Sequence, residues 1–321
     1  MLKTDAGNRG KFRGRAAAFL FWVLLIPAAT HCNIRDSLTR ASFTAGAEFA
    51  NPDGMPERQF VRHGENVYSF RYRFYRTLII DTSAGLVVVD PMNEKLAALA
   101  RSQIKIRFPN KQVHSLFYSH YHRDHVEGGK HFAPRNVVAH RKCPWYWKDL
   151  PDSSRILKPT RFIQGDRTFT IGGETIRLIY LGLSHTDTLY AFHLPGRNLV
   201  YAPDVGFVKS WPTPGPFHTY FPGYIRAMEK IAALDFRVFV PSHGPAGTRQ
   251  DFVDSMNMMK DLRATVVRAM REHDTETREG LGNLFDAVWP AWKKKYGHWR
   301  GFNEMAGLNL VRHMAGVDLG Y

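Results

Sequence analysis

The sequence predicts a mixed α+β fold, with sheets in the interior and helices outside them. Strand-like segments dominate the middle of the chain, and helical segments lie between and after them. Their order is neither a regular βαβ alternation nor an all-β pattern. The chain has 321 residues, of which 44% are hydrophobic and 23% charged, a composition typical of a folded protein.

The first segment, residues 1–31, is predicted to be a targeting signal. A basic stretch from Lys3 to Arg15 leads into the apolar run Ala16–Ala29. A run of about 14 apolar residues is short for a membrane span and typical of a signal-peptide core. We therefore expect a signal peptide and a secreted or periplasmic protein. If the segment is not cleaved, it would be an N-terminal membrane anchor.

Residues 32–59 are polar and irregular and are predicted to be a linker, with order beginning near residue 60. The alternating, aromatic stretch 66–75 predicts a strand, and 77–91 predicts two short strands around a turn. Apolar residues at helical spacing predict a helix over 93–107. A buried strand is then expected at 113–120, running into a cluster of histidines.

The second half of the chain is predicted to contain two hairpins, one over 167–182 and one over 187–204. The remaining predicted elements are strands at 136–140 and 236–244, helices at 225–234 and 251–272, and helices in the tail, 273–321, packed on the domain.

The central chemical feature is a cluster of three imidazoles and one carboxylate within six residues. It follows directly on an apolar strand, where a turn can direct alternate side chains into one pocket. Imidazole nitrogen and carboxylate oxygen are ligands that zinc accepts. Asp124 is also expected near a helix start, where the helix dipole favours a negative charge. The cluster consists of His120, His122, Asp124 and His125.

The pattern His120-x-His122-x-Asp124-His125 resembles the signature of the metallo-β-lactamase superfamily. The later parts of that signature follow in order, each at a strand end: His185, Asp204 and His243. The resemblance covers roughly residues 60–272. It implies a four-layer αβ/βα metallo-β-lactamase sandwich, with the active site at one edge of the two sheets.

The resemblance also implies two zinc ions and a hydrolase. His120, His122 and His185 would hold one ion, Asp124, His125 and His243 would hold the other, and Asp204 would bridge them. A metal-bridging hydroxide would then attack a carbonyl carbon. Asp124 would orient this hydroxide or pass on its proton, as the catalytic residue.

Departures from the family pattern narrow the expected activity. True zinc β-lactamases typically have Cys or Ser where this chain has Asp204, whereas glyoxalase II and lactonases have Asp. We therefore expect an ester, lactone or thioester substrate. Ser184 and Pro203 stand where many members have Gly. The sequence leaves the physiological substrate and the oligomeric state open.

A nucleic-acid partner is not expected, although the formal net charge is +15. The extra motifs of the nucleic-acid-cleaving branch are not recognisable, and no run of basic residues is interleaved with aromatics. The charge is interpreted as a solvated basic surface, and the expected partner is a small-molecule substrate.

Two alternatives stay open. Some similar proteins bind a single iron through positions matching His120, His122 and Asp204 or His185, and oxidise persulfides with oxygen. The second alternative is a secreted, non-catalytic protein with a structural metal. The ligand set argues against the second, because it keeps open coordination positions, as catalytic zinc sites do.

The aromatic, proline-rich stretch 206–224 is predicted to be a loop beside the active site. Trp211, Phe217 and Tyr220 are candidates for the substrate pocket, and the alternative is a loop that simply packs on the domain. Asp90, at the end of a strand, is predicted to support a ligand histidine, and the alternative is an ordinary turn residue at the strand end. Histidines 114, 131, 140 and 193 are expected to be structural, and His218 to lie at the surface.

Overall fold

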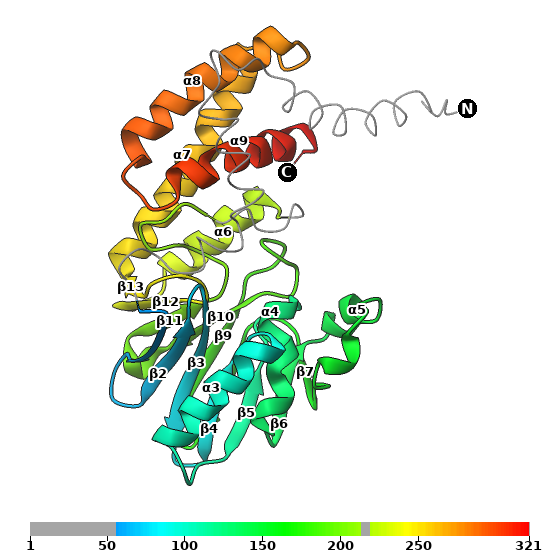
Figure 1. The fold of residues 1–321 in the computed structure, drawn as a ribbon, viewed down its shortest axis with the longest axis vertical. Coiled ribbons are helices and arrows are strands. Elements are labelled where there is room, and N and C mark those ends of the chain that lie inside the picture. Colours follow the sequence, from blue (N-terminus) through cyan, green and yellow to red (C-terminus); the bar gives the residue numbers. More distant parts are fainter. Residues whose placement is uncertain (1–55, 213–218, 321) are drawn as a thin grey trace, which may run out of the picture. The chain divides into compact units, whose positions relative to one another are not determined.

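Two mixed sheets form the framework of the described residues, 56–212 and 219–320, in a computed structural model (Figure 1). The seven-stranded sheet has the order β1 (Arg58–Arg62), β2 (Val67–Tyr72), β3 (Tyr75–Thr82), β4 (Gly85–Val89), β5 (Val113–Phe117), β6 (Asn136–His140) and β7 (Arg161–Ile163). The six-stranded sheet has the order β13 (Gly247–Thr248), β12 (Val238–Pro241), β11 (Leu199–Ala202), β10 (Tyr190–Leu194), β9 (Glu174–Tyr180) and β8 (Arg167–Ile171). Parallel pairing joins β4 to β7 through β5 and β6, and joins β11 to β12.

The helices lie between and after the strands. They are α3 (Glu94–Arg107), α4 (Arg123–Val126), α5 (Cys143–Trp147), α6 (Phe221–Ala232), α7 (Arg249–Glu272), α8 (Arg278–Tyr296) and α9 (Phe302–Asp318). Short 3-10 turns lie at η1 (Glu127–Phe132), η2 (Ser153–Arg155) and η3 (Pro195–Arg197).

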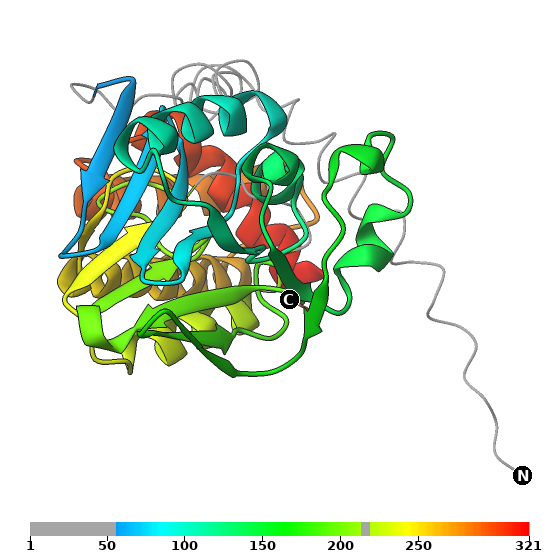
Figure 2. The same cartoon turned by 90° about the horizontal axis from the view of Figure 1, so that it is seen from below.

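Helix α3 covers the outer face of the seven-stranded sheet (Figure 2). The side chain of Asn93 caps the helix by accepting a hydrogen bond from the backbone N–H of Leu96. Leu96, Ala97, Ala100 and Ile104 form its buried stripe, which packs on the sheet. The predicted helix over 93–107 is thereby confirmed.

A second core lies between the two sheets. Val87, Val89 and Phe117 come from the seven-stranded sheet and pack with Phe192 and Tyr201 of the other. Successive side chains of a strand point to opposite faces. In β12, Val240 therefore enters this core, while Phe239 faces outward and contacts Phe252 of α7. Helix, sheet, sheet and helix follow one another, which confirms the predicted four-layer sandwich.

The structure corrects several expected boundaries. The stretch 66–75 is two strands, because the chain turns at Arg73, whose φ of +50° is left-handed. β1 begins at Arg58, inside the expected linker. Helix α6 begins at Phe221, within the stretch expected to be irregular, and Pro222 lies in its first turn. Proline suits that position because the N–H it lacks has no partner within the helix.

The sequence pattern does not predict α5, β7 and β13. All three are five residues or shorter, too short to show a period. The strands that the sequence does predict at 136–140 and in the two hairpins are present.

The chain divides into two compact units inside α7, between Met259 and Lys260. The unit that follows contains the end of α7 with α8 and α9, so the tail is helical, as predicted. Trp289 of α8 and Phe302 of α9 pack with ring centroids 4.9 Å apart. Among the described residues, no helix is both long and apolar enough to cross a membrane. The predicted signal segment, 1–31, lies outside the described residues.

Candidate metal centre

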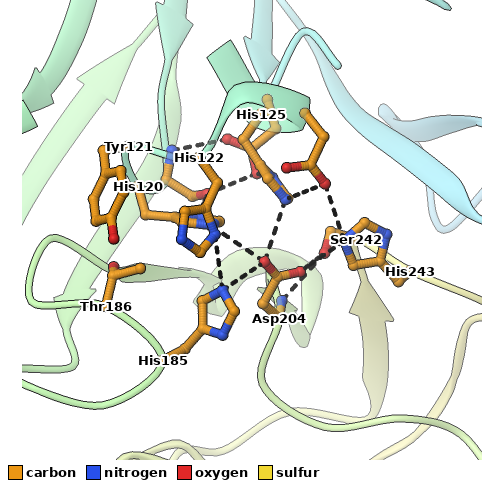
Figure 3. Close-up of polar contacts among 12 residues, drawn as sticks. His120, Tyr121, His122, His125, His185, Thr186, Asp204, Ser242 and His243 are labelled. Atoms are coloured by element: carbon orange, nitrogen blue, oxygen red, sulfur yellow. Dashed lines mark hydrogen bonds and ion pairs between the residues drawn. The ribbon is translucent and has the colours of Figure 1, made fainter. Parts of the chain in front are cut away.

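The seven residues predicted as metal ligands lie together at one edge of the two sheets (Figure 3). His120 follows β5, and Asp124 and His125 lie in the short helix α4 that comes next. His185 follows β9, Asp204 follows β11 and His243 follows β12. β9, β11 and β12 run in the same direction, because β10 is antiparallel to both β9 and β11 and β11 is parallel to β12. Their carboxyl ends therefore share one edge of the six-stranded sheet, and the end of β5 in the other sheet lies beside that edge.

The first group of donors consists of three imidazoles and one carboxylate: His120, His122, His185 and Asp204. The Nδ1 atom of His122 lies 2.8 Å from Nε2 of His120 and 3.0 Å from Nε2 of His185. The Oδ2 atom of Asp204 lies 3.2 Å and 3.0 Å from those same two Nε2 atoms. A tetrahedron with metal–ligand bonds of about 2.1 Å has edges of about 3.4 Å. The four donors therefore match the corners of a tetrahedral site to within a small adjustment.

The second group consists of Asp124, His125 and His243. The Oδ2 atom of Asp124 lies 3.3 Å from Nε2 of His125 and 3.5 Å from Nε2 of His243. Asp204 reaches this group too, because its Oδ2 is 3.3 Å from Nε2 of His125 and its Oδ1 is 2.9 Å from Nε2 of His243. Its carboxylate thus lies between the two groups, where the sequence predicted a bridging ligand (Figure 3).

The donor chemistry fits a cation. Nδ1 of His125 is 2.9 Å from Oδ2 of Asp90, so this nitrogen donates and carries the ring proton. The other ring nitrogen, Nε2, is buried and points into the centre (Figure 3). Its nearest groups are the carboxylates of Asp124 and Asp204. Burial acts to lower the pKa of His125, but the carboxylates of Asp124, Asp204 and Asp90 outweigh it and raise that pKa well above its usual value. A metal ion bound among these groups would take the place of the proton on Nε2.

The electrostatics of the centre agree with this. Burial and the neighbouring His125 lower the pKa of His120 to about 4. Burial, together with His120 and His185, holds the pKa of His122 well below its usual value. Both rings are therefore neutral near pH 7, the form that binds metal. Burial acts to raise the pKa of Asp204, but the surrounding histidines outweigh it and hold that pKa well below its usual value.

Asp90 supports the centre through hydrogen bonds to residues on its buried side. Besides binding His125, its Oδ1 accepts the backbone N–H of Ser119 at 2.8 Å, and its Oδ2 accepts the Ser119 hydroxyl at 2.8 Å. The hydroxyl of Tyr201 donates to the same Oδ2 at 3.2 Å. Asp90 thus fixes the ring of His125 and the turn before His120. The predicted support of a ligand histidine is found at this position.

Asp204 is held by two hydroxyl groups that the sequence pattern does not predict. The hydroxyl of Ser242 donates to Oδ1 of Asp204 at 2.7 Å, and the hydroxyl of Tyr224 donates to its backbone carbonyl at 2.9 Å. The backbone of Asp204 has a left-handed φ of +55°, which costs energy and persists because these contacts hold it. Ser242 directly precedes His243, and this adjacency was the available sequence signal.

His243 is held by the aromatic ring of Phe74, a contact that the sequence pattern does not predict. Phe74 stacks on the imidazole with ring centroids 4.4 Å apart and an interplanar angle of 7°. The backbone carbonyl of Phe74 accepts the N–H of Gly244 at 3.1 Å. The turn between β2 and β3 therefore positions His243, a predicted metal ligand that lies far away in the sequence.

The family follows from the comparison with known proteins. The family model described as "Metallo-beta-lactamase superfamily" matches residues 74–243, more than half of the chain. The matched range includes all seven clustered donors. The chain belongs to the metallo-beta-lactamase superfamily.

The relatives found by the comparisons share little sequence identity with this chain. The 2,4-dinitroanisole O-demethylase subunit alpha of Nocardioides sp. (strain JS1661) is 26% identical over 265 residues, which cover 77% of this chain and 75% of the relative. A metallo-beta-lactamase from Pontibacter korlensis matches with a TM-score of 0.56 and 18% identity, over 64% of this chain and 99% of that one. The sec-alkylsulfatase Pisa1 from Pseudomonas sp. gives a TM-score of 0.63 at 13% identity, over 93% of this chain and 61% of that one. The structural likenesses show a shared fold.

Two of the three expected pocket residues, Trp211 and Tyr220, lie in the part of the chain that the structure describes. Trp211 is fully buried, so its ring packs in the interior rather than facing a substrate, which fits the alternative of a packing loop. Phe217 lies outside the described residues. Tyr220 precedes α6, and its backbone N–H donates to the carbonyl of Ser184 at 2.9 Å. Tyr220 therefore lies next to the loop that carries His185.

The histidines expected to be structural have ordinary partners. His131 pairs with Glu94 at 2.8 Å, and His193 contacts the carbonyl of Asp235 at 2.9 Å. His114 contacts the hydroxyl of Ser115, and His140 stacks on Tyr180. None of these four belongs to the cluster of metal donors found among the described residues. His218 lies outside those residues.

Proposed function

We propose that this chain is a dinuclear zinc hydrolase that cleaves an ester, lactone or thioester bond. The observation that carries the proposal is the pair of donor groups that share Asp204. Bound there, two cations would lower the pKa of a water molecule and polarise a substrate carbonyl. The superfamily, whose members are mostly hydrolases, supports the same reaction class.

The side chains of the centre would have different roles in the reaction. His120, His122 and His185 are neutral-nitrogen donors that would hold one ion without adding charge. Asp124 is partly exposed and lies within 3.5 Å of His125 and His243. Its carboxylate is therefore placed to orient a water molecule and to accept its proton.

A protein nucleophile is not needed. Among the described residues Cys143 is the one cysteine, and it is buried with a pKa raised to about 12 by that burial. The serines beside the centre are already engaged: Ser119 with Asp90 and Ser242 with Asp204. Water is the remaining nucleophile that these residues can orient.

The donor set favours two zinc ions over the single iron of the oxidoreductase alternative. A mononuclear iron site would use His120, His122 and Asp204 or His185. It would leave Asp124, His125 and His243 without a metal ion, although His125 and His243 are buried and held in place. Nitrogen-rich sites with carboxylates suit zinc.

A second candidate is cleavage of an aryl methyl ether. It is favoured by the relative named 2,4-dinitroanisole O-demethylase subunit alpha, which matches over 77% of this chain. The attack by water would be the same, directed at the aryl carbon or methyl carbon instead of a carbonyl carbon. For both candidates we propose a small-molecule substrate and a location outside the cytoplasm, reached through the predicted signal segment.

The test is metal content together with turnover on the full-length chain. Mass spectrometry should find about two zinc ions per chain, falling in Asp204→Ala and unchanged in Asp235→Ala, an exposed control. Panels of esters, lactones, thioesters and nitroaryl methyl ethers should then show zinc-dependent hydrolysis. About one iron per chain with oxygen uptake on persulfides would overturn the proposal. Retained zinc with no turnover across all panels would favour a non-catalytic metal protein.

A further inference from the structure

An aromatic wall extends outward from the first donor group. Tyr121 lies between two ligand residues in the sequence, and its ring centroid is 4.7 Å from that of His122. Tyr146 of α5 stacks on Tyr121 at 3.9 Å, with an angle of 11°. Trp145 continues the series, with its ring edge-on to Tyr146 at 4.8 Å. Tyr121, Tyr146 and Trp145 are called the aromatic wall below.

The wall is fixed to the centre by polar contacts. The hydroxyl of Tyr146 donates to one oxygen of Asp187 at 2.7 Å, and Lys142 binds the other oxygen at 2.7 Å. Asp187 lies two residues after His185, in the same loop. The indole N–H of the buried Trp147 donates to the carbonyl of Tyr121 at 2.8 Å. Helix α5 is therefore anchored both to the histidine cluster and to the loop that carries His185.

Two large apolar side chains, one at the outer end of the wall and one near His185, are exposed to solvent. The side chain of Trp145 is 63% exposed, and Leu183, two residues before His185, is 57% exposed. Large apolar side chains held in solvent beside a functional site often mark a binding surface. Figure 3 shows Tyr121 beside His120 and His122 and directed toward Thr186, so the wall begins at the donors themselves.

We propose that the aromatic wall binds a planar aryl group of the substrate, next to the His120, His122 and His185 group. The proposal rests on the proposed function, because it assigns the substrate class to that same centre. Aromatic rings attract one another face to edge or in offset stacks, and a rigid wall loses little entropy on binding. A substrate ring is favoured over a separate macromolecule because the wall is continuous with the donors.

The test compares two thiols that share a zinc-binding group and differ in the ring: phenylmethanethiol and cyclohexylmethanethiol. Their affinities for the zinc-loaded, full-length protein are measured by titration calorimetry. The aromatic thiol should bind about three- to ten-fold more tightly. Trp145→Ala and Tyr146→Leu should bring the ratio close to one, whereas Tyr146→Phe, which keeps the ring, should retain it. Ile106→Ala removes an equally exposed apolar residue at the far end of α3 and should change nothing.

The outcomes separate this proposal from the proposed function. Equal affinity for the two thiols in the unmodified protein, or no binding of either thiol, overturns the aromatic wall as a substrate site. A ratio that survives both Trp145→Ala and Tyr146→Leu overturns it as well. Hydrolysis is measured on phenyl and cyclohexyl esters with the same preparations. An aromatic preference without turnover would support the wall and reject the hydrolase, and turnover without a preference would do the reverse.

Discussion

Replacing Asp90 by Asn tests whether a residue behind the centre controls one donor group. The substitution suits the backbone, because Asp90 has a left-handed φ of +58° and Asn tolerates that conformation. The amide oxygen would keep the hydrogen bond from the backbone N–H of Ser119. The amide NH2 would then replace Oδ2, the atom that accepts from Nδ1 of His125.

Two donors cannot share a hydrogen bond, so Nδ1 of His125 would have to become an acceptor. The ring proton would move to Nε2, the nitrogen that faces Asp124 and Asp204. A protonated Nε2 cannot bind a metal ion. Loss of such supporting contacts typically weakens metal affinity about 10- to 100-fold, or about 1.4–2.7 kcal/mol. We expect this loss at the group of Asp124, His125 and His243.

The assay is a zinc competition titration against a chromophoric chelator, which resolves two binding steps. Asp90→Asn should weaken one step by the stated factor and change the other much less. Asp235→Asn makes the same charge change at an exposed position and should leave both steps unchanged. Two unaltered steps, or two equally weakened steps, would refute the argument from the His125 proton.

Three further predictions concern the surroundings of the centre. Phe74→Ala removes the ring stacked on His243 and should weaken one zinc step about two- to ten-fold in the same titration; unchanged binding would contradict this. Gly223→Ala places a methyl group against the carbonyl oxygen of Leu183, so the melting temperature should fall, whereas Gly196→Ala meets no atom and should melt normally. Burial, with a smaller effect of Arg76, lowers the pKa of His63 from 6.5 to about 3. The unfolded chain therefore binds an extra proton between these values, and stability should fall as the pH drops through that window, by up to about 1.4 kcal/mol per pH unit. His63→Gln should reduce this dependence of the unfolding free energy on pH, measured by urea titrations at several pH values. An identical dependence in the variant and the unmodified protein would contradict the prediction.

The donor set could be predicted from the sequence because each ligand is marked by its position after a strand. The cluster from His120 to His125 is dense enough to indicate a metal site by itself. His185, Asp204 and His243 were identified through the family signature, and the structure brings all three to the same place. Asp90 was identified because it also ends a strand.

The supports and the wall could not be predicted, because their partners are far apart in the sequence. Phe74 lies in a short turn that was expected to be part of one strand. Helix α5 has five residues and shows no period, so neither the helix nor the stacking of Tyr146 on Tyr121 could be inferred. Trp211 was expected to line the substrate pocket, but its ring is buried. The aromatic character of a residue does not by itself distinguish a buried ring from an exposed one.

The distribution of the donors over both sheets has a consequence for folding. His120 to His125 follow a strand of one sheet, whereas His185, Asp204 and His243 follow strands of the other. Any ion held between them would be a cross-link between the two halves of the sandwich, closing loops of the chain much as a disulfide does. The supply of metal during synthesis would then determine how much of the protein reaches a stable fold, as well as how much of it is active.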